Sequence, residues 1–223
     1  IKEWPDSFST RNLRNNMVLE FYSIEVGCGM NLDEKFAYMA TGQPYRDTDA
    51  ELTALRDQAT LTTNAVNATA DPETKETLLR QLVGSAGRKP FVNPNFRVEF
   101  GRNIHLGDNF YANYDCVMLD GAPITIGSQV LLGPKVGLYT SNHLFDATER
   151  IRGGCIARPI TIGDGCWLAA NVTVLPGVTI GANTIIGGGS VVTQERPTSV
   201  SAGCNACQYI RQKTAEVRAG YTG

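Results

Sequence analysis

The feature that most constrains the fold is a period of six residues. In the second half of the chain, aliphatic side chains recur at Ile162, Leu168, Val174, Ile180, Ile186 and Val192. An earlier array slips by two residues in its middle and runs through Leu106, Ala112, Met118, Ile126, Leu132 and Leu138. A period of six matches neither an α-helix, which repeats after about 3.6 residues, nor an isolated strand, which alternates.

This period predicts a prism with three flat sides, in which each group of six residues supplies one short strand. Gly and Asn suit the tight corners because they adopt positive φ at little cost. The aliphatic side chains are expected to point inward and to stack on the next coil, about 4.8 Å away. Two such arrays predict a mainly β fold, a parallel β-solenoid of roughly four coils.

Residues 31–88 lack this period and favour helices. Asp71 can cap a helix that begins with Pro72, and Gly84 can end it. Apolar stripes at helical spacing are formed by Leu52, Leu55, Ala59, Leu78, Leu79 and Leu82. We therefore divide the chain into an extension of uncertain origin at 1–29, a small helical segment at 30–88 and a solenoid domain at 89–223. The solenoid domain contains a loop at 139–159 and ends in a C-terminal tail.

Composition excludes several classes of partner. The chain has 20 Lys and Arg against 22 Asp and Glu, a net charge of −2, so it lacks the basic surface that nucleic acid requires. Residues 165–194 are uncharged, but Pro176 and the six-residue spacing argue against a membrane span. The six cysteines are scattered, unlike a disulfide framework. We expect a cytoplasmic protein that binds small molecules.

The longest interruption of the repeat lies between Leu138 and Ile160, and it contains His143. Loops on a rigid scaffold commonly carry function, and imidazole titrates near neutral pH, where a general base is most effective. His143 is therefore a candidate catalytic base, although a single loop histidine can also be inert. His105, the only other histidine, lies in a strand-like stretch and favours a structural role.

The sequence does not favour a metal site. Two histidines cannot supply a three-histidine zinc centre of the kind found in some solenoid enzymes. Cys204 and Cys207 form a single C-x-x-C pair without a second pair, which favours a turn at the end of a coil over a zinc or redox site. We expect no metal cofactor.

Several longer segments carry a family resemblance. They read GRNIHLGDNFYANYDCVMLDGAPITIG, LLGPKVGLYTSNH, PITIGDGCWLAANVTVLPGVTIGANTIIGGGSVVT and, in the helical part, DEKFAYMATGQPYRDTDAEL. The chain resembles the maltose and galactoside O-acetyltransferase group of the hexapeptide-repeat acyltransferases. The resemblance implies a left-handed β-helix and acetyl transfer from acetyl-CoA to a hydroxyl of a maltose-, glucose- or galactoside-like sugar. It also implies a homotrimer with sites between subunits.

The resemblance assigns roles residue by residue. His143 matches the catalytic histidine. Positions on the acceptor side match Asp47, Asn113, Glu99 and Asp120, although Gly121 occupies the position next to Asp120 that the family uses. Positions on the CoA side match Gly133, Ala170, Gly188, Thr193, Gln194 and Arg211. Two alternatives stay open, since Asn113 can be a corner residue and Asp47 a helix N-cap.

These residue types fit direct transfer through a ternary complex. Neutral imidazole can take the proton of a sugar hydroxyl as it attacks the thioester, so no Ser or Cys nucleophile is needed. A backbone N–H near Ala170 is the candidate oxyanion donor. By resemblance, a group near Cys155, such as its carbonyl, fixes the histidine tautomer. Arg211, with Arg196 or Lys213, can pair with CoA phosphates.

The chain also departs from the family. Cys155 stands where relatives often carry a carboxylate or Met, Gln194 replaces a usual Lys, and GCNACQYI replaces the familiar ending of the solenoid. Two alternatives therefore remain. One is an acetyltransferase of the same fold with another acceptor, such as an amino sugar, an antibiotic hydroxyl or serine. The other is a solenoid scaffold without activity.

Overall fold

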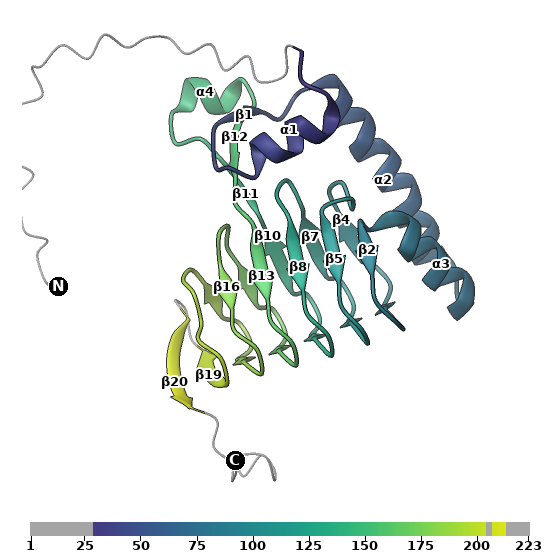
Figure 1. Ribbon diagram of the computed structural model, residues 1–223, viewed down its shortest axis with the longest axis vertical. Coiled ribbons are helices and arrows are strands. Elements are labelled where there is room, and N and C mark those ends of the chain that lie inside the picture. Colours follow the sequence, from purple (N-terminus) through teal and green to yellow (C-terminus); the bar gives the residue numbers. More distant parts are fainter. Residues whose placement is uncertain (1–28, 204–206, 213–223) are drawn as a thin grey trace, which may run out of the picture.

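The computed structural model describes residues 29–203 and 207–212, so the predicted extension at 1–29 falls almost wholly outside the described residues. The centre of the molecule is a prism of short parallel strands stacked coil upon coil (Figure 1). Each sheet of the prism pairs a strand with the equivalent strand of the next coil, as Ile124 pairs with Ile160. This confirms the β-solenoid that the six-residue period predicts.

The prism has three faces, which differ in their outward side chains. The polar face carries Ser85, His105, Thr125, Thr161 and Thr179 in register. It is built from β2 (Ser85–Ala86), β5 (Ile104–Leu106), β8 (Ile124–Ile126), β13 (Ile160–Ile162) and β16 (Thr179–Ile180).

The aromatic face carries Phe91, Tyr111, Leu131, Trp167 and Ile185 in register. Its parallel strands are β3 (Phe91–Val92), β6 (Tyr111–Ala112), β9 (Leu131–Leu132), β14 (Trp167–Leu168), β17 (Ile185–Ile186) and β19 (Val200–Gly203). An antiparallel strand, β20 (Gln208–Gln212), pairs with β19 at the last coil.

The mixed face carries Arg97, Val117, Gly137, Thr173 and Val191 in register. Its strands are β4 (Arg97–Val98), β7 (Val117–Leu119), β10 (Gly137–Tyr139), β15 (Thr173–Val174) and β18 (Val191–Val192). The three faces therefore present one hydroxyl-rich, one apolar and one mixed column to their surroundings.

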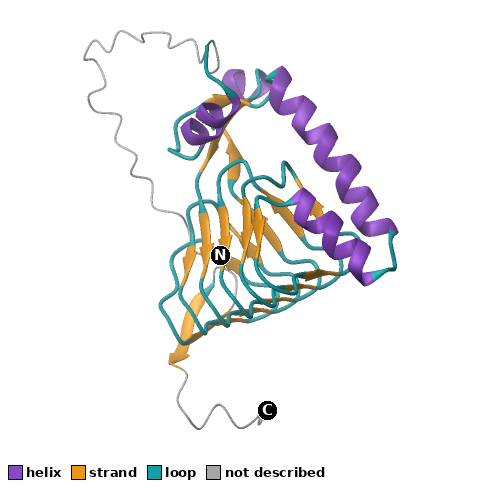
Figure 2. Cartoon of the chain, turned by 45° about the vertical axis from the view of Figure 1, so that its right-hand side comes forward, coloured by secondary structure: helices purple, strands orange, loops and turns teal. Residues whose placement is uncertain are grey.

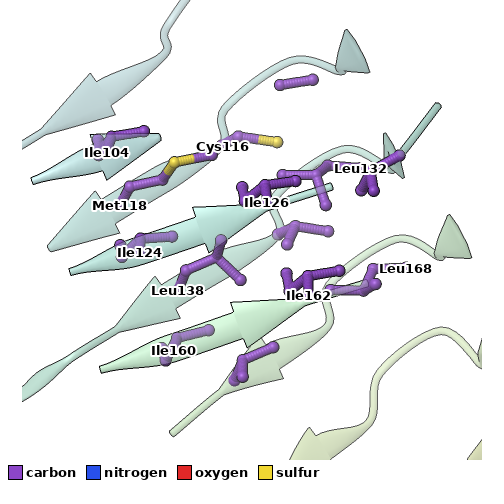
Figure 3. Packing of buried hydrophobic residues seen from close by; sticks show 14 of the residues in the cluster. Ile104, Cys116, Met118, Ile124, Ile126, Leu132, Leu138, Ile160, Ile162 and Leu168 are labelled. Carbon is purple, nitrogen blue, oxygen red and sulfur yellow. The ribbon is translucent and has the colours of Figure 1, made fainter. Parts of the chain in front are cut away.

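The aliphatic residues of the repeat fill the interior of the prism, as predicted. Ile124, Leu138 and Ile160 are 0% exposed. Figure 3 shows such side chains pointing into the space between the strands, stacked from one coil to the next. Close stacking of aliphatic groups in a dry interior is the main favourable term for a fold of this kind.

The predicted number of coils is too low. The polar and mixed faces each have five successive parallel strands and the aromatic face has six, since β2, β3 and β4 form a further coil before Ile104. The slip of two residues also has a structural cause, since β5 and β8 contain three residues and place two aliphatic side chains inward. Corners with positive φ are also less restricted than predicted, since Lys135, Gln129 and Asp115 adopt it beside Asn and Gly.

The helical segment covers the first coil. It contains α1 (Leu32–Met39), α2 (Ala50–Ala68) and α3 (Pro72–Leu82), and Figure 2 shows α2 and α3 against that end of the prism. Asp71 caps α3 as predicted, accepting from Thr74 N at 2.8 Å. In the part of the chain that the structure describes, no helix has both the length and the apolar character needed to cross a membrane.

The interruption at 139–159 forms a second, smaller unit beside the prism. Its elements are β11 (Ser141–His143), α4 (Ala147–Ile151) and β12 (Gly154–Ala157), and β12 pairs antiparallel with both β11 and β1 (Tyr45–Arg46). This β1–β12–β11 sheet projects above the coils in Figure 1. A separate hydrophobic cluster, which includes Phe36, Tyr45, Phe100, Cys155 and Ala157, packs around it.

Candidate active site

His143 ends strand β11 and is exposed, with Cys155 opposite it on β12. The Cys155 Sγ lies 3.2 Å from His143 Nδ1, and the cysteine is only 4% exposed. The sequence predicted that a group near Cys155, such as its carbonyl, would contact the ring. The structure places the contact at that residue but at the side-chain sulfur. His143 therefore has one ring nitrogen held by the protein.

Tyr45 flanks Cys155 on its other side, so a buried aromatic ring supports the central strand. The Tyr45 hydroxyl lies 3.4 Å from Ser141 Oγ. Burial raises the pKa of Tyr45 to about 12, so its phenol stays protonated near neutral pH. A Cβ at Gly121 would overlap Ser141 Oγ and lie 3.2 Å from the Tyr45 hydroxyl. Glycine at 121 thus leaves room for this contact.

Arg56 connects the helical segment to the prism beside this sheet, and no sequence pattern pointed to it. Its Nε donates to Glu99 Oε1 at 3.0 Å, and its guanidinium pairs with the Asp47 carboxylate. Asp47 is therefore an ion-pair partner and not a helix cap, because Asp49 caps α2. Burial raises the pKa of Glu99, and its Oε2 is buried without a hydrogen-bond partner.

Asp120 does not lie where an acceptor could touch it, which corrects the prediction. It is 0% exposed. Its Oδ1 accepts from the backbone N–H of Phe100 at 2.8 Å and of Gly101 at 3.1 Å, and its Oδ2 accepts from Asn103 N at 3.2 Å. A carboxylate enclosed in this way fixes the turn after β4 instead of binding a ligand.

Four predicted residues lie along one edge of the prism, between the aromatic and mixed faces. Asn113 N donates to Leu132 O just before Gly133, and a Cβ at Gly133 would lie 2.8 Å from Ala170 N. A Cβ at Gly188 would lie 3.2 Å from Ala170 O. Asn113, Gly133, Ala170 and Gly188 thus form a continuous line of small or short side chains, and positive φ at this corner belongs to Asp115 instead of Asn113.

The remaining predicted CoA residues lie elsewhere on the prism. Thr193 and Gln194 are exposed and follow β18, so they lie at the end of the mixed face. Arg211 is exposed on β20, opposite Ser201. Arg196 donates to Cys207 O at 2.6 Å, and Lys213 lies outside the described residues. The structure therefore does not gather these residues along the edge that holds Gly133.

The other candidate groups have structural surroundings. His105 Nδ1 lies 3.0 Å from Ser85 Oγ on the polar face, in line with the structural role expected for it. Within residues 29–203 and 207–212, no three His, Cys, Asp or Glu side chains are grouped so that they could hold a metal ion. Cys207 is buried, and its C-x-x-C partner Cys204 lies outside the described residues.

A parallel β-solenoid built from a six-residue repeat is the fold of the hexapeptide-repeat acyltransferases, and comparison with known proteins agrees. Residues 159–194 match the family described as Bacterial transferase hexapeptide (six repeats). Residues 38–87 match the Maltose acetyltransferase hexapeptide capping motif. The second match covers much of the segment that packs over the first coil and supplies β1.

Known proteins with similar sequences and structures carry acetyltransferase names. Galactoside O-acetyltransferase of Escherichia coli is 38% identical over 143 residues, which cover 64% of this chain and 70% of that protein. The crystal structure of a maltose O-acetyltransferase from Clostridium difficile aligns with a TM-score of 0.78 at 40% identity, over 80% of this chain and 97% of that one. A galactoside acetyltransferase in complex with coenzyme A gives 0.81 at 32% identity, over 87% and 96%.

The chain belongs to the maltose and galactoside O-acetyltransferase group of the hexapeptide-repeat family, and it is an acyltransferase.

Proposed function

We propose that this protein transfers an acetyl group from acetyl-CoA to a hydroxyl of a sugar, with His143 as general base. The observation that carries the proposal is His143 itself, an exposed imidazole at the repeat interruption whose Nδ1 is held by Cys155. Holding one nitrogen leaves the other to face a substrate. The acetyl donor is supported by the relative whose structure contains coenzyme A.

The reaction balances without a covalent enzyme intermediate. His143 Nε2 takes the proton of the acceptor hydroxyl while the hydroxyl oxygen attacks the thioester carbonyl carbon. A backbone N–H near Ala170 is our candidate donor to the resulting oxyanion. When the carbon–sulfur bond breaks, the imidazolium returns its proton to the departing thiolate. The products are an acetyl ester and free CoA, and His143 is neutral again.

On the acceptor side we retain Asp47, Glu99 and Asn113. Asp47 keeps 32% of its side chain exposed although it is paired with Arg56, so it can still accept from a sugar hydroxyl. On the CoA side we favour the edge of Gly133, Ala170 and Gly188, where the absence of large side chains lets a pantetheine arm lie close to the backbone. Thr193, Gln194 and Arg211 remain predictions from resemblance for the other end of CoA.

We further infer that the protein assembles with copies of itself, a homotrimer being the expected form. The supporting observation is the aromatic face, on which Phe91, Leu131 and Trp167 keep 40%, 48% and 40% of their surface exposed. A continuous apolar column of this kind is typical of a protein interface. Packing on this face would bring a second copy beside the Gly133 edge. A cytoplasmic location also stays a prediction.

The direct test compares the two histidines of the chain. In a thiol-release assay with acetyl-CoA and a panel of sugar acceptors, His143→Ala should lower turnover by about 10²–10⁴-fold. The matched variant His105→Ala removes the same group from the polar face and should retain turnover. Full activity of His143→Ala would eliminate the proposed mechanism, and calorimetry without detectable CoA binding would favour a scaffold.

A further inference from the structure

We propose that Cys155 is the positioning residue of His143: its sulfur accepts a hydrogen bond from Nδ1–H and thereby keeps the Nε2 lone pair free for the acceptor. The inference rests on the proposed function, because it assigns a role in the same reaction. It is carried by the 3.2 Å contact between Sγ and Nδ1 across paired strands β11 and β12.

The side chain of Cys155 is buried, whereas that of His143 is exposed at the surface. The cysteine is 4% exposed and belongs to the hydrophobic cluster beneath the β1–β12–β11 sheet. Its strand is the central one, paired with His143 on one side and with Tyr45 on the other. A side chain held from both sides can orient an exposed ring that it contacts.

The groups that face Cys155 keep its thiol neutral. Burial raises the pKa of Cys155, and the nearby carboxylate of Glu99 raises it further, while the Arg56 guanidinium acts in the opposite direction with less effect. Tyr45 on the adjoining strand stays protonated, since burial raises its pKa to about 12. A neutral thiol orients the ring, but unlike a carboxylate it gives the imidazolium no ionic partner.

The hydrogen bond can run in either direction, and only one direction suits a base. If His143 Nδ1–H donates to Cys155 Sγ, Nε2 is unprotonated and can take a proton. If the thiol donates to Nδ1, Nε2 carries the hydrogen and cannot act as the base. The tautomer of His143 is therefore the quantity that decides the proposal. With only two histidines in the chain, it can be measured without ambiguity.

The first experiment is NMR on the full chain labelled with ¹⁵N-histidine, with His105→Gln used to assign the two rings. We expect the Nδ1–H tautomer for His143 near neutral pH, and a mixture of tautomers in Cys155→Ala. An Nε2–H tautomer in the unaltered protein, or no change in Cys155→Ala, would overturn the proposal. This readout does not depend on turnover, so it separates failure of this inference from failure of the proposed function.

The second experiment measures the pH profile of turnover. Cys155→Ala should lower kcat by about 10- to 100-fold with little change in the KM for acetyl-CoA, and Cys155→Ser should restore part of the loss. Cys155→Asp should move the acid limb of kcat/KM to higher pH, because a carboxylate stabilises the imidazolium. Cys166→Ala is the control, since it removes another buried thiol, which donates a hydrogen bond to Gly181 O at 3.1 Å. It should leave the acid limb of kcat/KM at the same pH. An unmoved limb in Cys155→Asp would contradict the proposal.

Discussion

The prism and the β1–β12–β11 sheet are built in opposite ways. Each coil of the prism pairs with its neighbours in the sequence, and the same aliphatic pattern is used again at every level. The small sheet instead joins segments that are far apart, since Tyr45 and Ser141 are 96 positions from each other. Repetition provides a rigid support, and the site residues gather only where a non-repeating segment crosses it.

The two regions should therefore differ most in the energetic cost of losing a side chain. Leu138→Ala, in the interior of the prism at 0% exposure, should lower the free energy of unfolding by about 2–5 kcal/mol. Phe145→Ala, in the interruption at 101% exposure, should change it by less than about 0.5 kcal/mol. Guanidinium unfolding followed by circular dichroism measures both. Equal losses of unfolding free energy in the two variants would contradict the proposed difference between the prism and the interruption.

The next largest effect concerns the outer surface of the prism. Trp167→Lys on the aromatic face should cost about 2 kcal/mol or more of association free energy and shift the protein to smaller assemblies. The matched variant Thr161→Lys adds the same charge to the polar face and should leave assembly unchanged. Light scattering after gel filtration distinguishes them. If Thr161→Lys alone dissociates the protein, the interface lies on the other face.

A third prediction tests the close contacts behind the site. Gly121→Ala should lower turnover by about 10- to 100-fold, because the added methyl displaces Ser141 and the strand that ends in His143. Gly203→Ala, near Ile210 at the far end of the prism, should have little effect on turnover. Steady-state kinetics of both variants provides the comparison. Unchanged turnover in Gly121→Ala would mean that β11 tolerates displacement.

The smallest effect is expected in the helical segment, where Asp49 at the start of α2 pairs with Lys35. Burial alone would raise the pKa of Asp49, but hydrogen bonds from Lys35 and from Leu52 N hold it below its usual 3.8. Because the folded-state pKa is lowered, this stabilisation is present above pH 3.8 and is lost as the pH falls through the folded-state value.

Asp49→Asn keeps the helix cap but removes the charge beside Lys35, and it should cost about 1 kcal/mol at neutral pH. The difference in free energy of unfolding between the variant and the unaltered protein should shrink as the pH falls below about 4. Asp49 then becomes protonated, first in the unfolded and then in the folded state, and no longer differs in charge from Asn. Urea unfolding across this pH range measures the difference. A constant difference at every pH would show that the ion pair does not contribute.

The contrast between the regions also explains how much could be predicted from sequence. The spacing of Ile162, Leu168 and Val174 was enough for the solenoid, because each residue of a repeat reports the same environment. The first coil was missed although Ala86, Val92 and Val98 carry the same spacing, because only Ala86 is followed by a small residue, Gly87. His143 could be singled out because it lies in the long segment that interrupts the repeat.

The immediate surroundings of His143 could not be predicted in the same way. Arg56 and Tyr45 reach the site through tertiary contacts that no local pattern encodes. Asp120 was assigned to the acceptor by resemblance, yet its carboxylate is enclosed by backbone N–H groups. A motif preserves the position of a residue, but burial decides whether the residue can meet a ligand.

The most direct test of the central claim is a crystal structure of the protein with CoA and a sugar acceptor bound. We predict that the acceptor hydroxyl lies within hydrogen-bond reach of His143 Nε2, about 2.6–3.2 Å, and that the pantetheine arm follows the edge marked by Gly133 and Gly188. A CoA bound along another edge, with its sulfur remote from His143, would contradict the account.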